Sequence, residues 1–379
     1  MPLPRLLALA LLASVATTPA RADVQPCGLP VAMEDGWRVA PPQASGLDQA
    51  ALCRLAARLE GPARPNVHAV LVVRGGKLAF ERYFTGDDER WGRWLGTIAF
   101  GPDTIHDMRS VTKTVTALLV GAAIDRGLLA GVDEPVMKFF PEYADLRTPE
   151  RDRILLRHLL TMTMGIAWDE ERPYTDPSNS ELQMSRTQDP LRYVLEQPVV
   201  AAPGEQYRYN GGATALLAAV VQRATGQSLE AFARSALFQP LGIAQVEWIR
   251  LRDGNPAAAS GLRLRPRDLA KIGQMLLAGG TWAGRRVLSA EWVREVATPR
   301  IGGSGLYLYG YQVWLGRSFA GGTEIRWFAG VGLGGQRVFV VPDLDLVVVT
   351  NAGMYANAQQ STVALDILNR VVEAAVAAK

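Results

Sequence analysis

Segments with the pattern of β-strands lie at both ends of this chain, and segments with the pattern of helices fill its middle. Near the N-terminus, Val67–Val73 and Lys77–Phe84 flank the turn Arg74–Gly75–Gly76 and predict a β-hairpin. Four short β-branched or aromatic runs follow near the C-terminus, at Tyr309–Leu315, Glu324–Ala329, Gln336–Val341 and Leu344–Thr350. Because short strands joined by tight turns pair antiparallel, we expect one antiparallel sheet assembled from both ends of the chain.

The segments between these strands repeat their apolar residues with helical spacing. They are Val111–Arg126, Ile154–Met162, Leu216–Ala224, Leu229–Leu237 and Arg267–Leu277, and a further amphipathic segment, Thr362–Ala378, ends the chain. The sequence therefore predicts an α+β fold. Residues 23–104 and 281–379 would form a discontinuous sheet domain flanked by helices, and residues 105–280 a mainly helical lobe. We expect a ligand cleft between the two, covered by a long mobile loop at residues 167–190.

The first 22 residues have the three parts of a secretory signal. Arg5 is the only charge before the apolar stretch Leu6–Val15, and Ala20–Arg21–Ala22 has the small residues of a cleavage site. That stretch is too short to span a bilayer, and no later stretch reaches spanning length without charges. We therefore expect a soluble protein, periplasmic or secreted, with no membrane anchor.

Cysteine content and charge limit the partners further. Cys27 and Cys53 are the two cysteines of the chain. In an oxidising compartment they could close a loop that stabilises the fold by about 3 kcal/mol, or they could remain free thiols. Neither has the spacing of a metal ligand or a catalytic cysteine. The 40 basic and 37 acidic residues nearly balance, and the basic residues are not clustered in the sequence. We therefore expect no nucleic-acid partner.

Ser110–Lys113 is the single S-x-x-K sequence of the chain, and it opens a predicted helix. Residues three apart share a helix face, so the lysine amine can reach the serine hydroxyl. The first helical turn favours a developing alkoxide through the helix dipole, and Asp107 is placed to cap the helix. A buried lysine with a lowered pKa would supply the base that the hydroxyl needs. The alternative is a lysine that packs along the helix with its amine in a salt bridge.

Several further motifs follow in a fixed order: His158-Leu-Leu-Thr-Met-Thr-Met-Gly165, Pro203-Gly204, Tyr209-Asn210-Gly211-Gly212, Thr225-Gly226-Gln227-Ser228-Leu229, Pro240-Leu241-Gly242-Ile243 and Ala259-Ser260-Gly261-Leu262. In this combination the chain resembles the serine β-lactamase and penicillin-recognising superfamily over residues 68–354, and most of all its class C-like branch of esterases and 6-aminohexanoate-dimer hydrolases. The resemblance implies a β-lactamase/transpeptidase-like fold. It also implies a cofactor-free acyl-enzyme mechanism in which Ser110 is the acylated nucleophile and Lys113 activates it.

The second motif of this superfamily is Tyr-x-Asn, in which the tyrosine shuttles protons. Tyr209 takes that role by the resemblance, with Tyr207 as the competing tyrosine of the same strand-like segment. The position of the motif asparagine is Gly211 in this chain. We expect the neighbouring Asn210 to contact the substrate in its place.

The third motif, usually Lys-Thr-Gly or His-x-Gly, aligns with Gly330–Val331–Gly332 and lacks its basic residue. Gly332 would let a strand approach the substrate closely. The resemblance implies an oxyanion hole made by the backbone amides of Ser110 and Leu333. Without the cation, binding of a β-lactam carboxylate should be weaker. The spacing Gly330-x-Gly332-x-x-Gly335 also matches a dinucleotide fingerprint, but a predicted strand follows it instead of a helix, so we expect no such cofactor.

Tyr174, in the predicted loop, resembles the loop tyrosine that approaches the scissile amide in 6-aminohexanoate-dimer hydrolases, and it equally fits a tyrosine facing solvent. The three histidines, His68, His106 and His158, lack the spacing of metal ligands. No G-x-S-x-G sequence supports a Ser-His-Asp mechanism either. We expect the histidines to be structural hydrogen-bonding groups and expect no metal site.

Together these features predict an exported serine hydrolase that cleaves an ester or amide bond of a small molecule. Two alternatives stay open. The first is a D-alanyl peptidase or β-lactamase that acts on peptidoglycan-like or β-lactam substrates. The second is a catalytically inactive binding protein with the same fold. For the enzyme we expect a bell-shaped pH–rate profile from Lys113 and Tyr209, at least one of them with a lowered pKa.

Overall fold

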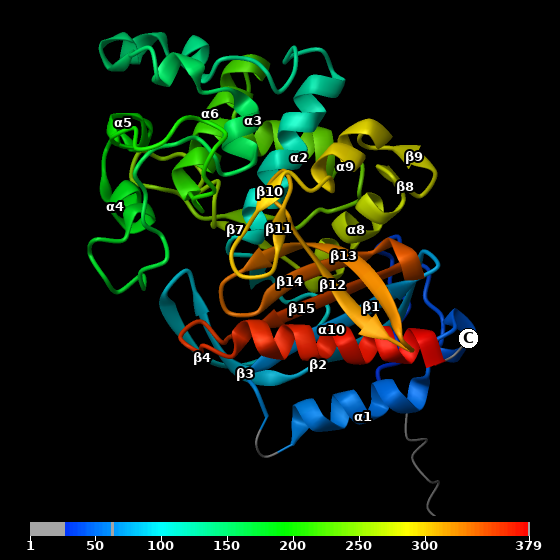
Figure 1. The fold of residues 1–379 in the computed structure, drawn as a ribbon. Coiled ribbons are helices and arrows are strands. Elements are labelled where there is room, and N and C mark those ends of the chain that lie inside the picture. Colours follow the sequence, from blue (N-terminus) through cyan, green and yellow to red (C-terminus); the bar gives the residue numbers. More distant parts are fainter. Residues whose placement is uncertain (1–26, 62–63, 378–379) are drawn as a thin grey trace, which may run out of the picture.

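The computed structural model describes residues 27–61 and 64–377, so the predicted signal segment lies outside the described residues. A large sheet lies below a mainly helical region (Figure 1). The strands of this sheet follow the order β10-β11-β12-β13-β14-β15-β1-β2. Their bounds are β1 Val67–Arg74, β2 Lys77–Tyr83, β10 Ile301–Gly302, β11 Leu308–Tyr309, β12 Trp314–Ala320, β13 Thr323–Gly332, β14 Gln336–Val341 and β15 Leu346–Ala352.

Both ends of the chain contribute to this sheet, as the sequence predicts. Next to its β2 edge, β1 pairs antiparallel with β15, from Val67 opposite Ala352 to Arg74 opposite Leu346. The neighbouring pairs β1–β2, β13–β14 and β14–β15 are antiparallel as well. The expected antiparallel α+β architecture is therefore confirmed.

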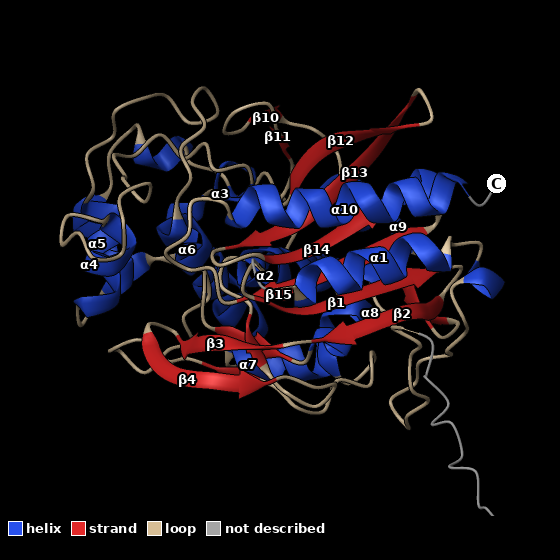
Figure 2. Cartoon of the chain, turned by 90° about the horizontal axis from the view of Figure 1, so that it is seen from below, coloured by secondary structure: helices blue, strands red, loops and turns tan. Residues whose placement is uncertain are grey.

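The core has two parts, one on each face of the sheet. Along β1, Leu71 and Val73 point into one hydrophobic cluster, and Val70 and Val72 point into the other. The helices α1 (Gln49–Glu60) and α10 (Gln360–Ala377) cover the second face (Figure 2). The helices α2 (Val111–Asp125) and α8 (Pro266–Leu277) pack on the first face. Since both faces are covered, β14 and β15 are buried at every position and most of their residues are apolar.

Helices α2 and α6 pack against each other in the helical region. The bounds of the remaining helices are α3 Leu156–Leu160, α4 Ser180–Arg186, α5 Pro190–Glu196, α6 Gly211–Thr225, α7 Leu229–Ala233 and α9 Ala290–Val296. Shorter helical turns occur along the chain at Gln43–Ser45, Val136–Phe139, Pro141–Leu146, Arg151–Arg153, Arg234–Phe238 and Pro342–Leu344. Within the described ranges, no helix has both the length and the hydrophobicity needed to cross a membrane.

Three small sheets complete the structure. The hairpin β3 (Thr85–Arg90) and β4 (Arg93–Ala99) was not predicted, because β3 is strongly charged and β4 is mostly exposed, so neither has an alternating apolar face. A three-stranded sheet contains β5 (His106–Asp107), β7 (Leu262–Leu264) and β6 (Glu247–Trp248). The last pair is β8 (Thr281–Trp282) with β9 (Arg285–Arg286).

Two predictions about local structure were wrong. The single strand expected at Tyr309–Leu315 is broken, because Gln312 adopts a left-handed backbone with φ 58° between β11 and β12. Its buried amide donates to the Leu159 carbonyl and accepts from Thr214, so it is held in the helical region. The segment 167–190, expected as a long loop, contains α4 and buries Glu181.

Cys27 and Cys53 form a disulfide with a Cα–Cα distance of 5.5 Å. The bond joins the first described residue of the chain to α1. Of the two states left open by the sequence, the structure therefore shows the bonded one.

Candidate active site

Ser110 and Lys113 meet at the start of α2. Ser110 is the N-cap residue of this helix, and Lys113 follows one turn later on the same face. The Lys113 Nζ atom lies 3.1 Å from Ser110 Oγ and 3.4 Å from the carbonyl oxygen of Ala259. The lysine side chain is 1% exposed, and Ser110 is half-buried. The geometry expected of an S-x-x-K nucleophile is therefore present.

Asp107 does not cap α2, contrary to the expectation from the sequence. It lies in β5, where its carboxylate accepts from Arg263 at 2.7 Å and lies 3.4 Å from Arg109 Nε. Ser110 thus starts the helix itself, with its hydroxyl at the positive end of the helix dipole.

The residue before the nucleophile has a strained backbone. Arg109 has φ 48°, a left-handed conformation that costs a non-glycine residue about 1–3 kcal/mol. Its guanidinium donates to Glu89 and stacks over the ring of Tyr355 at 4.6 Å. These contacts hold the sharp turn that presents Ser110 at the end of β5.

Tyr209 joins Ser110 and Lys113 from the segment that precedes α6. Its ring centre lies 4.6 Å from Lys113 Nζ, and the nearby Ser110 hydroxyl opposes part of the rise that burial causes in the pKa of Tyr209. Tyr207 instead packs against Tyr309, with ring centres 5.2 Å apart. The structure therefore places Tyr209, and not Tyr207, in the cluster.

Glu170 is the residue of this cluster that the sequence did not reveal. Its Oε1 atom lies 3.2 Å from Lys113 Nζ, and its side chain is 2% exposed. Its Oε2 atom accepts from Trp168 Nε1 at 2.9 Å and from the backbone N–H of Gly211 at 2.5 Å. Lys113 thus makes both the contact with the nucleophile and the salt bridge that the sequence left as alternatives.

A second buried carboxyl, Glu181 of α4, lies beside Glu170 against Gly211. Glu181 also accepts from Ser260 Oγ at 2.9 Å and from the Tyr174 hydroxyl. Burial and the charge of Glu181 raise the pKa of Glu170 to about 7. Burial also favours neutral Glu181, but the Lys113 charge and its hydrogen bonds outweigh this and lower its pKa. The pair therefore shares one proton below neutral pH.

Gly211 makes room for these carboxyls. A Cβ atom at this position would lie 3.0 Å from Glu170 Oε2 and 3.1 Å from Glu181 Cδ. By the family resemblance, Gly211 stands where the second motif has its asparagine. Two carboxyls therefore occupy the space in which a side chain at 211 would lie, and Glu170 is bonded to Lys113 there.

The same carboxyls change the expected protonation of Lys113. Burial alone would lower the pKa of Lys113, but the charges of Glu170, Tyr209 and Glu181 raise it above its usual value. Burial raises the pKa of Tyr209 too, against the opposing charge of Lys113. The expectation that at least one of the two has a lowered pKa is wrong for this structure, because the negative groups around them favour the ammonium and the neutral phenol.

Two predicted substrate contacts are engaged elsewhere. Asn210 is 1% exposed, and its side chain accepts from the N–H of Ala213 as the N-cap of α6. It is not free to bind a substrate, which corrects the expectation from the sequence. Tyr174 is 41% exposed, but its hydroxyl points inward to Glu181. Tyr174 is therefore linked to the Ser110 cluster through the Glu181 carboxyl.

The third motif lies beside the nucleophile at the end of β13. A Cβ atom at Gly332 would lie 2.4 Å from the Met108 carbonyl oxygen, so only glycine permits this approach. A Cβ atom at Gly330 would lie 3.0 Å from Thr114 Oγ1 of α2. Strand β13, which ends one residue before Leu333, is therefore packed against the residues that lead into Ser110.

His158, the histidine of the first long motif, has a structural role. Its Nδ1 atom accepts from the N–H of Leu155 at 3.1 Å. Burial and the charge of Arg157 lower its pKa to about 4, so it is neutral.

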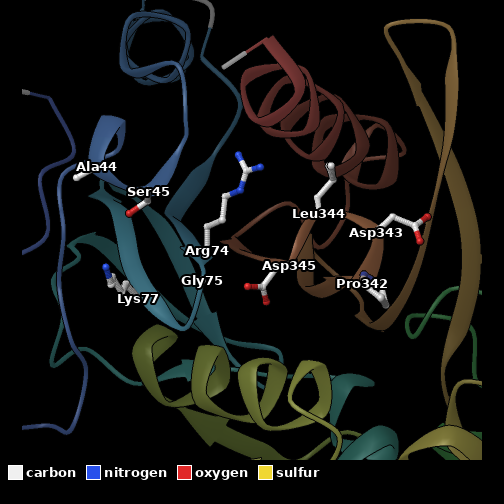
Figure 3. A pocket seen from close by; sticks show the side chains of 9 residues that line it. All are labelled: Ala44, Ser45, Arg74, Gly75, Lys77, Pro342, Asp343, Leu344 and Asp345. Carbon is white, nitrogen blue, oxygen red and sulfur yellow. The ribbon is translucent and has the colours of Figure 1, made fainter. Parts of the chain in front are cut away.

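A surface cavity of about 420 Å³ lies elsewhere, with Arg74 and Asp345 at its centre (Figure 3). It opens where β1 and β14 end at Arg74 and Val341. The third motif lies at the opposite end of β14. This cavity is therefore separate from the Ser110 cluster.

The comparison with protein families matches residues 56–376 to the Beta-lactamase family. A 6-aminohexanoate-dimer hydrolase of Paenarthrobacter ureafaciens is 28% identical over 306 residues, which cover 74% of this chain and 71% of that protein. Esterase EstB of Burkholderia gladioli is 33% identical over 214 residues, and the match covers 53% of each protein.

Solved structures show the same fold. EstCE1, a hydrolase with promiscuous acyltransferase activity, has a TM-score of 0.65 at 16% identity, over 86% of this chain and 99% of that one. The octameric penicillin-binding protein homologue from Pyrococcus abyssi has a TM-score of 0.64 at 20% identity, over 84% of this chain and 76% of that one. With most of its length matched and its S-x-x-K serine and lysine in contact, this chain belongs to the β-lactamase family and is a serine hydrolase.

Proposed function

We propose that this protein hydrolyses ester or amide bonds of small molecules through a covalent acyl-enzyme on Ser110. One observation carries the proposal: the Ser110 hydroxyl, the Lys113 ammonium and the Tyr209 phenol meet in one cluster at the start of α2. The names of the relatives, one an amide-dimer hydrolase and one an esterase, support the two bond types.

Acylation begins when Ser110 Oγ attacks the carbonyl carbon of the substrate. The serine proton passes to Lys113, which gives one of its own protons to Glu170, so the lysine remains an ammonium ion throughout. When the tetrahedral intermediate collapses, the bond to the leaving group breaks. The leaving group takes a proton from Tyr209, and Glu170 restores that proton through Lys113. The products of this step are acyl-Ser110 and the protonated leaving group.

Deacylation repeats the same transfers with water as the nucleophile. The water oxygen attacks the acyl carbon, and its proton passes by the same route to Glu170. The bond between the carbonyl carbon and Ser110 Oγ then breaks, and the proton returns to the serine. Glu170 is suited to this exchange because its pKa of about 7 lies near the working pH.

The amides of Ser110 and Leu333 would stabilise the negative oxygen of each tetrahedral intermediate. The approach of Gly332 to the Met108 carbonyl supports this pairing, since it brings the end of β13 beside the turn at Ser110. A basic side chain at Gly330 would have to displace Thr114. The substrates we propose therefore carry no carboxylate for such a cation to bind, which favours neutral esters and amides over β-lactams.

We also propose that the protein is exported. The signal-like residues 1–22 support this, and so does the Cys27–Cys53 disulfide, because disulfides persist in oxidising compartments.

The test compares p-nitrophenyl esters, linear amide dimers, nitrocefin and a labelled penicillin in parallel, with fluorophosphonate labelling of the wild type and of Ser110→Ala. Ester or amide turnover, with labelling that Ser110→Ala abolishes, supports the proposal. Faster turnover of nitrocefin would make the protein a β-lactamase, and a long-lived penicilloyl adduct would make it a D-alanyl peptidase. If neither substrates nor label react, and Ser110→Ala binds ligands as the wild type does, the protein is an inactive binding protein.

A further inference from the structure

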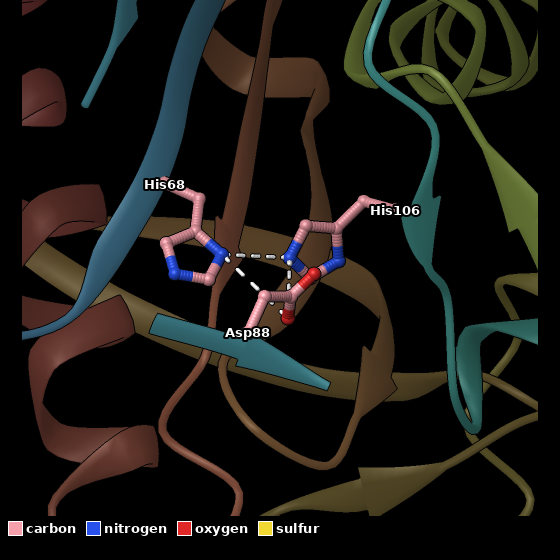
Figure 4. Close-up of side chains that lie close together, drawn as sticks. All are labelled: His68, Asp88 and His106. Carbon is pink, nitrogen blue, oxygen red and sulfur yellow. Dashed lines mark hydrogen bonds and ion pairs between the residues drawn. The ribbon is translucent and has the colours of Figure 1, made fainter. Parts of the chain in front are cut away.

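Three buried side chains converge outside the Ser110 cluster, from three different strands (Figure 4). His68 of β1 and His106 of β5 are 0% exposed, and Asp88 of β3 is 3% exposed. His68 Nδ1 lies 2.8 Å from His106 Nε2. Asp88 Oδ1 lies 3.6 Å from His106 Nε2 and 4.0 Å from His68 Nδ1. No step of the proposed reaction uses these groups.

The outer partner of His68 shows which of its nitrogens carries the proton. His68 Nε2 faces Asn66 Oδ1 at 3.1 Å. The Asn66 amide can point only one way, because its Nδ2 donates to the carbonyls of Asp87 and Gly353 at 2.7 and 3.1 Å. Its Oδ1 also accepts the N–H of Asp87 at 3.0 Å. His68 therefore donates from Nε2 and directs the lone pair of Nδ1 inward.

His106 has the complementary arrangement. Its Nδ1 atom faces the carbonyl oxygen of Asp107 at 3.0 Å, which can only accept a hydrogen bond. Its Nε2 atom therefore directs a lone pair inward as well. Two nitrogen lone pairs and the Asp88 carboxylate thus face one another in a buried space, and such an arrangement requires a positive group between them.

We propose that His68, Asp88 and His106 bind one divalent metal ion, Zn²⁺ or a transition-metal ion of similar coordination chemistry. When an ion with bonds near 2.0–2.1 Å is coordinated tetrahedrally, two of its ligand atoms lie about 3.3 Å apart. The three separations between the ligand atoms here, 2.8, 3.6 and 4.0 Å, lie on both sides of this value. Two imidazoles and a carboxylate are a donor set that suits zinc. Asn66 and the Asp107 carbonyl act as the outer hydrogen-bond partners that orient metal-bound imidazoles.

A shared proton is the competing explanation, and it accounts for less of the geometry. A proton between the two imidazoles would satisfy the contact of 2.8 Å. It would leave the Asp88 carboxylate beyond hydrogen-bond distance of both rings, since its nearer separation is 3.6 Å. A metal ion engages all three groups at once.

The bound ion would be a positioning element and not a catalytic one. It would join β1, β3 and β5, and His106 lies four residues before Ser110. Asp88 also accepts from the Tyr355 hydroxyl at 3.1 Å, and Tyr355 carries the stacked Arg109 guanidinium. The ion would therefore fix the strand and the turn that present the nucleophile.

The test uses tag-free full-length protein purified without chelators. Elemental analysis should find about one ion of Zn²⁺ or a similar transition metal per chain. After chelator treatment, the stripped protein should melt at a lower temperature and regain its melting temperature with one equivalent of Zn²⁺. Co²⁺ should give the intense visible absorption of a tetrahedral site. These readouts do not depend on activity, so they stay decisive if the proposed reaction is wrong.

Variants locate the site. His106→Asn and Asp88→Asn should lose stoichiometric binding, and Asn66→Ala, which keeps all three ligands, should bind Zn²⁺ about 10–100-fold more weakly. The matched control His158→Asn changes a buried histidine outside the cluster and should bind as the wild type does. Absence of Zn²⁺ and Co²⁺ binding by the stripped wild type would overturn the proposal in favour of a shared proton. Unchanged binding by the ligand variants would overturn it as well.

Discussion

Glu170→Gln keeps the shape of the side chain but removes the group that we propose as the final proton acceptor. In the wild type the carboxylate lies 3.2 Å from Lys113 Nζ in a buried position. At an effective dielectric constant of about 20, two unit charges at this distance attract by about 5 kcal/mol, or between 3 and 4 pKa units. With Glu170 ionised, a free amine on Lys113 is therefore out of reach near neutral pH, and only a relay to Glu170 can accept the serine proton.

The substitution should have two effects on kcat/KM for a p-nitrophenyl ester. At pH 7.5 the value should fall by about 10²–10⁴-fold, the usual contribution of a general base. Wild-type activity should rise with pH as Glu170 loses its proton near pH 7. In the variant that rise should move to alkaline pH, because a free Lys113 amine becomes the remaining base. The pKa of Lys113 should also be lower in the variant than in the wild type, since the Glu170 carboxylate, its main negative neighbour, is gone.

The assay is a pH–rate profile from pH 5 to 10, with Glu171→Gln, an exposed neighbour, as the matched control. Thermal unfolding checks that the loss of a buried charge has not unfolded the variant. A Glu170→Gln profile that keeps its rise near pH 7, with less than a tenfold loss, would refute the relay. An increase in activity at neutral pH would refute it too, and would show that Glu170 only holds Lys113 in its charged form.

Three other variants probe the rest of the structure. Tyr209→Phe keeps the ring over Lys113 but removes the hydroxyl, so kcat/KM in the ester assay should fall by about 10²–10⁴-fold with little change in melting temperature. Gly332→Ala places a Cβ atom 2.4 Å from a carbonyl oxygen before the nucleophile, so fluorophosphonate labelling should slow markedly. Replacing Cys27 and Cys53 by serine should lower the free energy of unfolding in urea by about 3 kcal/mol, and no loss would show that the disulfide is not formed in the wild type.

The central sheet could be predicted because its strands are buried on both faces. Val67–Arg74 and Leu346–Ala352 are mostly apolar segments rich in valine, and the structure pairs them as neighbouring strands of the sheet. The hairpin Thr85–Arg90 with Arg93–Ala99 could not be recognised, since its side chains are charged or exposed and its pairing is set by neighbouring segments. The break at Gln312 has a similar origin, because its buried contacts lie in another part of the fold.

In the candidate site, local spacing was informative and long-range contacts were not. Ser110 and Lys113 are three residues apart on one helix, so the sequence predicts their contact directly. Glu170 and Glu181 come from a polar segment with no regular pattern, and only the fold brings them to Lys113. One signal did exist: glycine at 211, in place of a motif side chain, indicates that another group fills that space.

The pairing of β1 with β15 has a consequence for how the chain is made. Residue 67 finds its partner at residue 352, so a nascent chain that stops before residue 346 carries β1 with an open, valine-rich edge. Such edges are templates for aggregation, and contacts of this sequence separation form slowly. The β1–β15 pair can form only after residues 346–352 have been made, so we expect the unfinished chain to be the state of this protein most prone to aggregate.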